Sequence, residues 1–160
     1  FDIPLVGLDP AMTLVYRQEY RKVAGLECPD VLLPQEWLLK ALDGQPEQPG
    51  KTVAFRLLGH CTEKTNAAPS AAMWVKVFEQ AGLQVTAEAT GCCGMSGTYG
   101  HEARNLETSR TIFAQSWAPA LDSGAAAEPL ATGYSCRSQV ARIKNATLRH
   151  PIQALLEHLR

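Results

Sequence analysis

Short apolar segments alternate along the chain with longer segments of mixed polarity. In residues 83–90 apolar and polar side chains alternate, with Leu83, Val85, Ala87 and Ala89 on one face, which is typical of a strand with one less buried side. The other apolar runs are short and continuous, which favours buried strands. The pattern therefore predicts four strands, at residues 3–8, within 51–61, at 83–90 and at 129–133.

The segments between these strands repeat apolar residues at helical spacing. After Pro69, for example, Trp74, Val77 and Ala81 fall on one helical face, and Gly82 marks the end of the segment. Prolines and glycines bound several other segments in the same way. We therefore predict helices at 11–26, 34–44, 69–81 and 102–117, one beginning at 137, and one from 151 to 159.

Alternation of strands and helices predicts an α/β fold with a mostly parallel four-stranded sheet flanked by helices, because each parallel crossover has room for a helix. The length of 160 residues suits a single domain, residues 1–160, with a real core. A hydrophobic content of 46% and a charged content of 19% are ordinary for globular proteins.

Four of the five cysteines directly follow predicted strands: Cys61, Cys92, Cys93 and Cys136. The carboxyl ends of parallel strands meet at one edge of a sheet, where functional groups gather. We therefore expect three separate loops to bring these four thiols together. Cys28 lies elsewhere and is expected to be a small buried hydrophobic residue.

Cys92 and Cys93 lie in a glycine-rich segment, "TGCCGMSGTYGHE", at residues 90–102. A disulfide between adjacent cysteines is strained, because their α-carbons lie only ~3.8 Å apart. Gly91, Gly94 and Gly97 can adopt positive φ angles that bend the backbone around a bound group, and their amides can donate to sulfur or to an anion.

Thiolates are soft ligands that suit iron–sulfur clusters, zinc and copper(I), and four of them complete a cluster or a structural zinc site. His60, directly before Cys61, and His101, after the glycine segment, are candidates for a further ligand or a proton carrier. Two other interpretations remain open: the cysteines are small core residues, or one is a catalytic nucleophile with a histidine as base.

Charge and motifs exclude several classes of protein. A net charge of −1 argues against a nucleic-acid partner, and no GxGxxG follows the first predicted strand. No apolar run is long enough to span a membrane. The odd number and irregular spacing of the cysteines indicate reduced thiols and a protein that is cytoplasmic or faces a reducing compartment. Because the chain starts at Phe1, directly in an apolar stretch, we expect it to be part of a longer polypeptide; a processed mature protein is the alternative.

The cysteine pattern resembles the cysteine-rich "CCG" domain, in which a cysteine, Cys-Cys-Gly and a late CxxC follow one another at gaps of 30 to 40 residues. Here 30 residues lie between Cys61 and Cys92, and 42 between Cys93 and Cys136. This domain occurs in heterodisulfide reductase B subunits, in iron–sulfur subunits of glycolate and lactate oxidases, and in FAD-linked oxidases. The segments "VGLDPAMTLVYRQEY", "LLGHCTEKT", "GCCGMSGTYGHE" and "LATGYSCRSQV" look most similar to the C-terminal domain of oxidoreductases of the D-2-hydroxyglutarate dehydrogenase type.

This resemblance implies a redox module that relays electrons from the FAD of an upstream flavin domain, next to a ferredoxin-like domain of the same polypeptide. Cys61, Cys92, Cys93 and Cys136 would then bind a 4Fe-4S cluster or zinc, and the chain alone would have no dehydrogenase activity. His60, Glu63 and His101 would support these ligands or handle protons. The alternative is a structural zinc or docking domain that transfers no electrons.

The chain departs from the family pattern at two places. Gly133 stands where CxxC has its first cysteine, so only Cys136 is left to act as a ligand there. In the first predicted loop, where family members often have a cysteine, the sequence reads Asp-Pro-Ala-Met at residues 9–12. The chain itself therefore supplies at most four cysteines, or three cysteines and His60, to one site.

Overall fold

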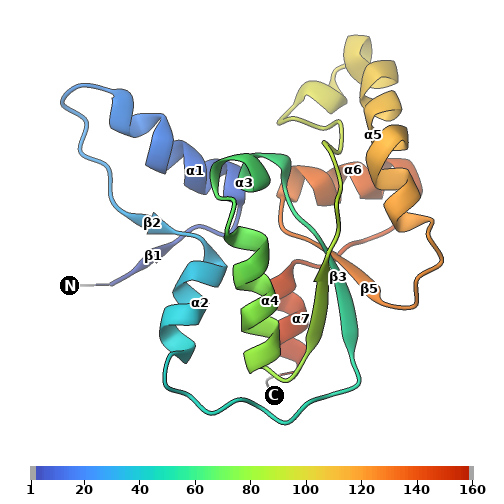
Figure 1. The fold of residues 1–160 in the computed structure, drawn as a ribbon. Coiled ribbons are helices and arrows are strands. Elements are labelled where there is room, and N and C mark those ends of the chain that lie inside the picture. Colours follow the sequence, from blue (N-terminus) through green and yellow to red (C-terminus); the bar gives the residue numbers. More distant parts are fainter. Residues whose placement is uncertain (1–2, 159–160) are drawn as a thin grey trace.

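The computed structural model describes residues 3–158 and has α/β architecture (Figure 1). Its strands are β1 (Leu5–Val6), β2 (Val31–Leu32), β3 (Ala54–Leu58), β4 (Gln84–Ala87) and β5 (Glu128–Ala131). Its α-helices are α1 (Pro10–Gln18), α2 (Pro34–Leu42), α3 (Cys61–Asn66), α4 (Ser70–Gln80), α5 (Leu106–Leu121), α6 (Tyr134–Lys144) and α7 (Pro151–His158). Single 3-10 turns lie at Tyr20–Lys22, Tyr99–His101 and Ala103–Asn105.

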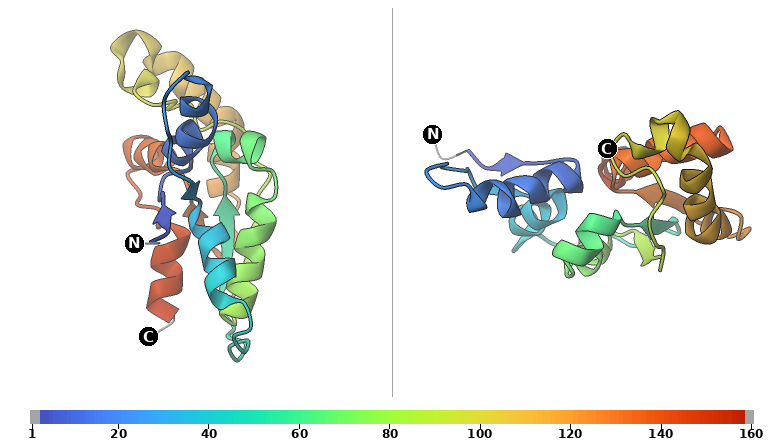
Figure 2. Two further views of the ribbon diagram at one scale, coloured as in Figure 1. Left: turned by 90° about the vertical axis from the view of Figure 1, so that its left-hand side faces the viewer. Right: turned by 90° about the horizontal axis from the view of Figure 1, so that it is seen from above.

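The main sheet is parallel, with strand order β4-β3-β5. In its centre Leu57 of β3 pairs with Ala87 of β4 and with Leu130 of β5, and an isolated parallel bridge joins Leu130 to Arg149. Helix α4 covers one side of this sheet and α7 the other (Figures 1 and 2). Because all three strands run in the same direction, their carboxyl ends lie at one edge, below α5 and α6 in Figure 1.

The buried apolar residues form two clusters. The first lies between the main sheet, α4 and α7, with Phe55, Trp74, Phe78 and Leu130 among its members. The second lies at the carboxyl edge of the sheet against α5 and α6, and comprises Leu58, Cys93, Met95, Phe113, Trp117, Ala131, Cys136, Val140 and Leu148. Cys93 and Cys136 are therefore packed in this second core cluster.

The expected four-stranded sheet is wrong: the described residues form a three-stranded sheet and a separate two-stranded one. Strand β1 lies within the predicted strand at residues 3–8, but it pairs in parallel with β2, as Leu5 with Val31 and Val6 with Leu32. The two-residue strand β2 has no detectable periodicity and lies between Pro29 and Pro34. No local sequence pattern therefore indicates that β1 pairs with β2 instead of joining the main sheet.

Most helix predictions are confirmed, with shifted ends. Helix α1 stops at Gln18 and continues only as a 3-10 turn, so the predicted helix at 11–26 is too long. Helix α5 begins four residues later than predicted and runs through Pro119. The short, polar helix α3 was not predicted. Leu159, the last apolar residue of the predicted final helix, lies outside the described residues.

The segments β1–α1–β2–α2 and β5–α6–Arg149–α7 have the same order of elements. In each, a strand is followed by a helix, then by a parallel backbone pairing with that strand, and then by a helix that begins with a proline, Pro34 or Pro151. Met12 lies in the first turn of α1, as Cys136 does in α6. Met12, in the loop where family members often have a cysteine, therefore occupies a position in the fold equivalent to that of Cys136.

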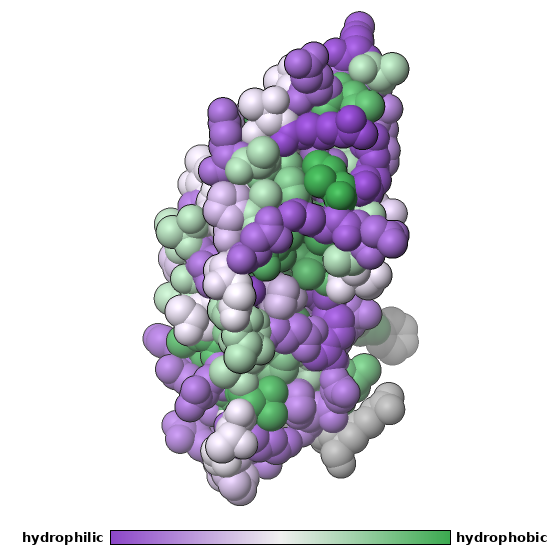
Figure 3. Space-filling model, turned by 90° about the vertical axis from the view of Figure 1, so that its right-hand side faces the viewer, coloured by the Kyte–Doolittle hydropathy of each residue, from purple (hydrophilic) through white to green (hydrophobic). Residues whose placement is uncertain are grey.

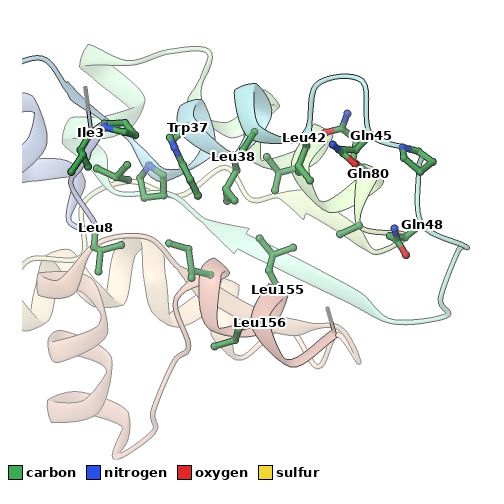
Figure 4. A pocket seen from close by; sticks show the side chains of 18 residues that line it. Ile3, Leu8, Trp37, Leu38, Leu42, Gln45, Gln48, Gln80, Leu155 and Leu156 are labelled. Atoms are coloured by element: carbon green, nitrogen blue, oxygen red, sulfur yellow. The ribbon is translucent and has the colours of Figure 1, made fainter. Parts of the chain in front are cut away.

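A large apolar groove of about 920 Å³ lies on the surface of the described residues. Figure 4 shows Trp37, Leu38 and Leu42 of α2 on one side of it and Leu155 and Leu156 of α7 on the other. None of the cysteines lines this groove. On the α5 side of the molecule, hydrophilic residues are interleaved with small apolar areas (Figure 3). Between residues 3 and 158, no helix combines the length and the apolar character needed to cross a membrane.

Candidate functional site

Three loops at the carboxyl edge of the main sheet carry the four cysteines. Cys61 is the first residue of α3, which follows β3; Cys92 and Cys93 follow β4; and Cys136 lies in the first turn of α6, after β5. A cavity of about 570 Å³ opens at this edge, and Cys61, Cys92 and Cys93 line it. Cys136 is 1% exposed and lies behind the cavity wall.

The thiols lie close enough to shift one another's pKa in pairs: Cys61 with Cys92, Cys92 with Cys93, and Cys93 with Cys136. The pKa of Cys92 is lowered because the thiols of Cys61 and Cys93 donate to its sulfur, as does the backbone N–H of Gly94, whose nitrogen lies 3.3 Å from it. The pKa of Cys61 is raised by its hydrogen bond to Cys92 and by burial. The pKa of Cys93 is raised by its hydrogen bonds to Cys136 and Cys92. Negative charge in this cluster is therefore favoured at Cys92.

The donor set fits a thiolate-bound metal or cluster in type and in place, because three loops bring four soft ligands to the cavity and to the core cluster beside it. The side chains do not form a ready-made coordination group: within residues 3–158 no three Cys, His, Asp or Glu side chains are arranged to hold a metal ion. Binding would therefore require some cysteine side chains to turn toward a common centre.

The glycine-rich segment is held closely against α5. Gly94 has φ +84°, and a Cβ atom there would lie 2.3 Å from the carbonyl oxygen of Ser109. The Ser109 hydroxyl donates to the carbonyl of Gly94 over 2.8 Å, and the indole N–H of Trp117 donates to the carbonyl of Gly91 over 3.2 Å. Gly97 also has a positive φ, of 62°, in open space. These contacts fix the backbone on both sides of the paired cysteines.

His60 lines the cavity, but both of its ring nitrogens have partners within the chain. Nδ1 accepts from the backbone N–H of Thr62 at 3.2 Å, and Nε2 lies 3.2 Å from the hydroxyl of Ser135. Burial lowers the pKa of His60, although Asp9 and Glu63 act in the opposite direction. His60 therefore acts as a neutral cap of α3 in this structure rather than as a free ligand.

His101 also lines the cavity and is exposed, with Nδ1 3.4 Å from a guanidinium nitrogen of Arg142. Cys28 is half-buried and lies outside the cavity lining. Of the sequence-derived candidates, the structure thus brings Cys61, Cys92 and Cys93 to the cavity, with Cys136 in contact behind them and both histidines at its wall.

Asp9 is a site residue that the sequence analysis missed. Its carboxylate caps α1 by accepting from the backbone N–H groups of Ala11 and Met12, and its other oxygen accepts from Tyr134 N at 2.9 Å. Asp9 and Met12 both line the cavity. The Asp-Pro pair at the end of an apolar run is a helix N-cap signature that could have identified the cap, although not the contact to Tyr134.

Gly133 lies where two cysteine loops touch. A Cβ atom there would lie 2.3 Å from Cδ2 of His60 and 3.2 Å from Sγ of Cys136. A side chain at this position would therefore push the Cys61 and Cys136 loops apart.

Curated proteins with similar sequences include dehydrogenases. The chain is 65% identical over 158 residues to D-2-hydroxyglutarate dehydrogenase of Pseudomonas putida; the match covers 98% of this chain and 15% of that enzyme. It is 46% identical over 157 residues to D-2-hydroxyglutarate dehydrogenase of Escherichia coli, a match that covers 97% of this chain and 15% of that enzyme. It is 25% identical over 163 residues to one subunit of the anaerobic glycerol-3-phosphate dehydrogenase of Escherichia coli, covering 98% of this chain and 41% of that protein. No family model matches the chain. No solved structure matches it either. The chain is therefore a close homologue, over nearly its whole length, of one segment of D-2-hydroxyglutarate dehydrogenases, and it spans about 15% of the length of those curated relatives.

Proposed function

We propose that the chain is the cysteine-rich redox module of a longer, FAD-linked 2-hydroxy-acid dehydrogenase. In this proposal Cys61, Cys92, Cys93 and Cys136 bind an iron–sulfur cluster of the 4Fe-4S type, and flavin and ferredoxin-like domains lie elsewhere in the same polypeptide. The observation that carries the proposal is the gathering of Cys61, Cys92 and Cys93 around one cavity at the carboxyl edge of the sheet, with Cys136 packed in the same core cluster as Cys93. The homology to D-2-hydroxyglutarate dehydrogenases supports the choice of parent enzyme.

The proposal assigns separate tasks to the two parts of the enzyme. Oxidation of a 2-hydroxy acid to a 2-oxo acid releases two electrons, which the flavin of the parent enzyme would take up. A bound iron–sulfur cluster would accept and pass on electrons one at a time. The chain's own residues supply the sulfur ligands, and the Gly94 N–H donates to Cys92, which favours the thiolate form that ligation requires. Residues 1–160 would form a single domain in a cytoplasmic enzyme, consistent with five free cysteines.

A structural zinc site is the second candidate. It is favoured by the burial of Cys93 and Cys136, at 2% and 1% exposure, because structural zinc sites are closed to solvent. In that case the domain would stabilise or dock onto the flavin domain without carrying electrons.

Anaerobic preparation of the full-length protein distinguishes the two. An iron–sulfur module predicts iron and acid-labile sulfide in nearly equal amounts and broad visible absorption, whereas a zinc site predicts zinc and no colour. Cys92→Ser and Cys93→Ser should each lower the bound metal strongly. Cys28→Ser is the matched control and should leave it unchanged, because Cys28 lies outside the cavity. Equal metal content in the Cys92, Cys93 and unaltered proteins would falsify ligation by the pair.

A further inference from the structure

The carboxyl group of Glu63 is buried, at 3% exposure, and accepts three hydrogen bonds from three other elements. Its Oε1 accepts from the hydroxyl of Ser70, the first residue of α4, and from the side-chain amide of Gln35 in α2, at 3.2 Å. Its Oε2 accepts from the hydroxyl of Thr132, at the end of β5. A buried carboxyl group is costly unless such donors satisfy it.

The contact to Thr132 continues to the loop before Cys61. The oxygen of Thr132 accepts from the backbone N–H of His60 at 2.9 Å, and all three groups are buried. Thr132 is followed by Gly133, which packs against the His60 ring. Glu63, Thr132 and the His60 N–H therefore form a continuous link, here termed the Glu63 clamp, between the loop of Cys61 and the loop of Cys136.

The two oxygens of Glu63 serve different parts of the fold. Oε1 is bound to α4 and α2, which lie away from the cysteines, whereas Oε2 is bound to the clamp. The Ser70 hydroxyl also accepts from Gln35 at 2.5 Å, so α2 and α4 remain hydrogen-bonded to each other without Glu63. The bond from Thr132 to Oε2 has no such second connection to Glu63, and it acts beside the contact of His60 Nε2 with the Ser135 hydroxyl, which also joins the two cysteine loops.

We propose that Glu63 is a positioning residue that holds the Cys61 loop against the Cys136 loop and so sets the spacing of the thiols in the proposed metal site. It acts through Thr132 and the His60 N–H, and it touches no bound group itself. The inference rests on the proposed function only for what the thiols bind; the clamp exists in the protein without any bound group.

Thr132 variants of the full-length protein test the clamp. Thr132→Val keeps the shape of the side chain and removes its hydroxyl, whereas Thr132→Ser keeps the hydroxyl. The rate of Cys61 alkylation by iodoacetamide is measured in the metal-free protein by mass spectrometry of the Cys61 peptide. We expect this rate to rise about tenfold or more in Thr132→Val and in Glu63→Ala, because each removes the buried hydrogen bond between Thr132 and the carboxylate. Thr132→Ser should restore the slow rate.

Ser70→Ala is the matched control, because it removes a hydrogen bond to the same carboxyl group on the side away from the cysteines. In Ser70→Ala the rate of Cys61 alkylation should stay within about twofold of that in the unaltered protein, because the hydrogen bond between Thr132 and Glu63 is kept. Equal acceleration in Ser70→Ala and Thr132→Val would show a general loosening and overturn the proposal, as would an unchanged rate in Thr132→Val. Metal analysis of the same proteins separates the two proposals: an unaltered protein without iron or zinc contradicts the proposed function, while the alkylation rates still decide the clamp.

Discussion

A single methyl group at Gly133 is expected to destabilise the contact between two of the cysteine loops. Gly133 has φ −82° and ψ 135°, a conformation that any residue adopts, so Gly133→Ala introduces no backbone strain. Its Cβ atom would, however, lie 2.3 Å from Cδ2 and 3.0 Å from Cγ of His60, and 3.2 Å from Sγ of Cys136. Both neighbours are buried, and the His60 ring is held by Thr62 N and Ser135, so it cannot move aside without losing these contacts.

The cost follows from what His60 must give up. Overpacking a buried site costs about 1–3 kcal/mol. Moving the ring also stretches its bonds to Thr62 N and to Ser135, each worth about 1 kcal/mol net. We therefore expect Gly133→Ala to lower the free energy of unfolding by about 2–4 kcal/mol. With a urea m-value of about 2 kcal/mol/M, the midpoint of unfolding should fall by about 1–2 M.

Urea unfolding followed by the fluorescence of the buried Trp74 and Trp117 measures this change. Gly50→Ala is the control, because a Cβ atom at Gly50 meets nothing within 4 Å and should leave the midpoint unchanged or slightly raised. In a His60→Ala background the penalty of Gly133→Ala should largely disappear, since the clashing ring is gone. A Gly133→Ala protein within about 0.5 kcal/mol of the unaltered one would refute the packing argument, because that is the usual range for substitutions without a buried clash.

Two further outcomes are expected. Gly94→Ala should lower the free energy of unfolding by at least about 2 kcal/mol in the same urea assay and make the paired cysteines more accessible to alkylation. The reason is that Gly94 has a positive φ and that a Cβ atom there would lie 2.3 Å from the Ser109 carbonyl oxygen. An unchanged midpoint of unfolding would contradict this prediction. Burial lowers the pKa of His150 to about 4; Arg137 acts in the same direction and Asp9 in the opposite one. As the pH falls, His150 therefore takes up a proton in the unfolded chain at a higher pH than in the folded protein. Stability should therefore fall between pH 6.5 and 4 by about 3 kcal/mol through this residue, and His150→Asn, which keeps a helix cap, should remove that part of the pH dependence. If unfolding free energies measured at pH 7 and pH 4.5 differ equally in both proteins, His150 does not contribute.

The elements that the sequence predicts well are those with local signals. Helix α4 has an apolar stripe and is bounded by Pro69 and Gly82, and its observed span matches the prediction within a residue at each end. The polar helix α3 carries no apolar stripe and was missed. Strand β4 ends at Ala87, and only the first half of its predicted apolar face is buried, because β4 is an edge strand. Strand pairing is non-local, which is why the partner of β1 could not be predicted.

The site divides in the same way. The placement of Cys61, Cys92 and Cys136 after three strands follows from the rule that parallel strands end at one edge. The contacts that shape the site join residues far apart in the sequence. The bond between Asp9 and Tyr134 spans 125 positions, and the approach of Gly133 to the His60 ring depends on how two loops pack. No periodicity or motif encodes such contacts.

The adjacency of Cys92 and Cys93 is explained by the two different neighbours that these side chains reach. Both side chains line the cavity, but Cys92 lies beside the thiol of Cys61, whereas Cys93, which is 2% exposed, packs in the same core cluster as Cys136. A single cysteine could contact only one of these loops. The pair must also lie close to α5, and Gly94 permits this because it has no side chain to strike the Ser109 carbonyl. The glycine and the adjacent cysteines therefore act together: Gly94 lets the segment lie close to α5, and there Cys92 reaches the Cys61 loop and Cys93 reaches the Cys136 loop.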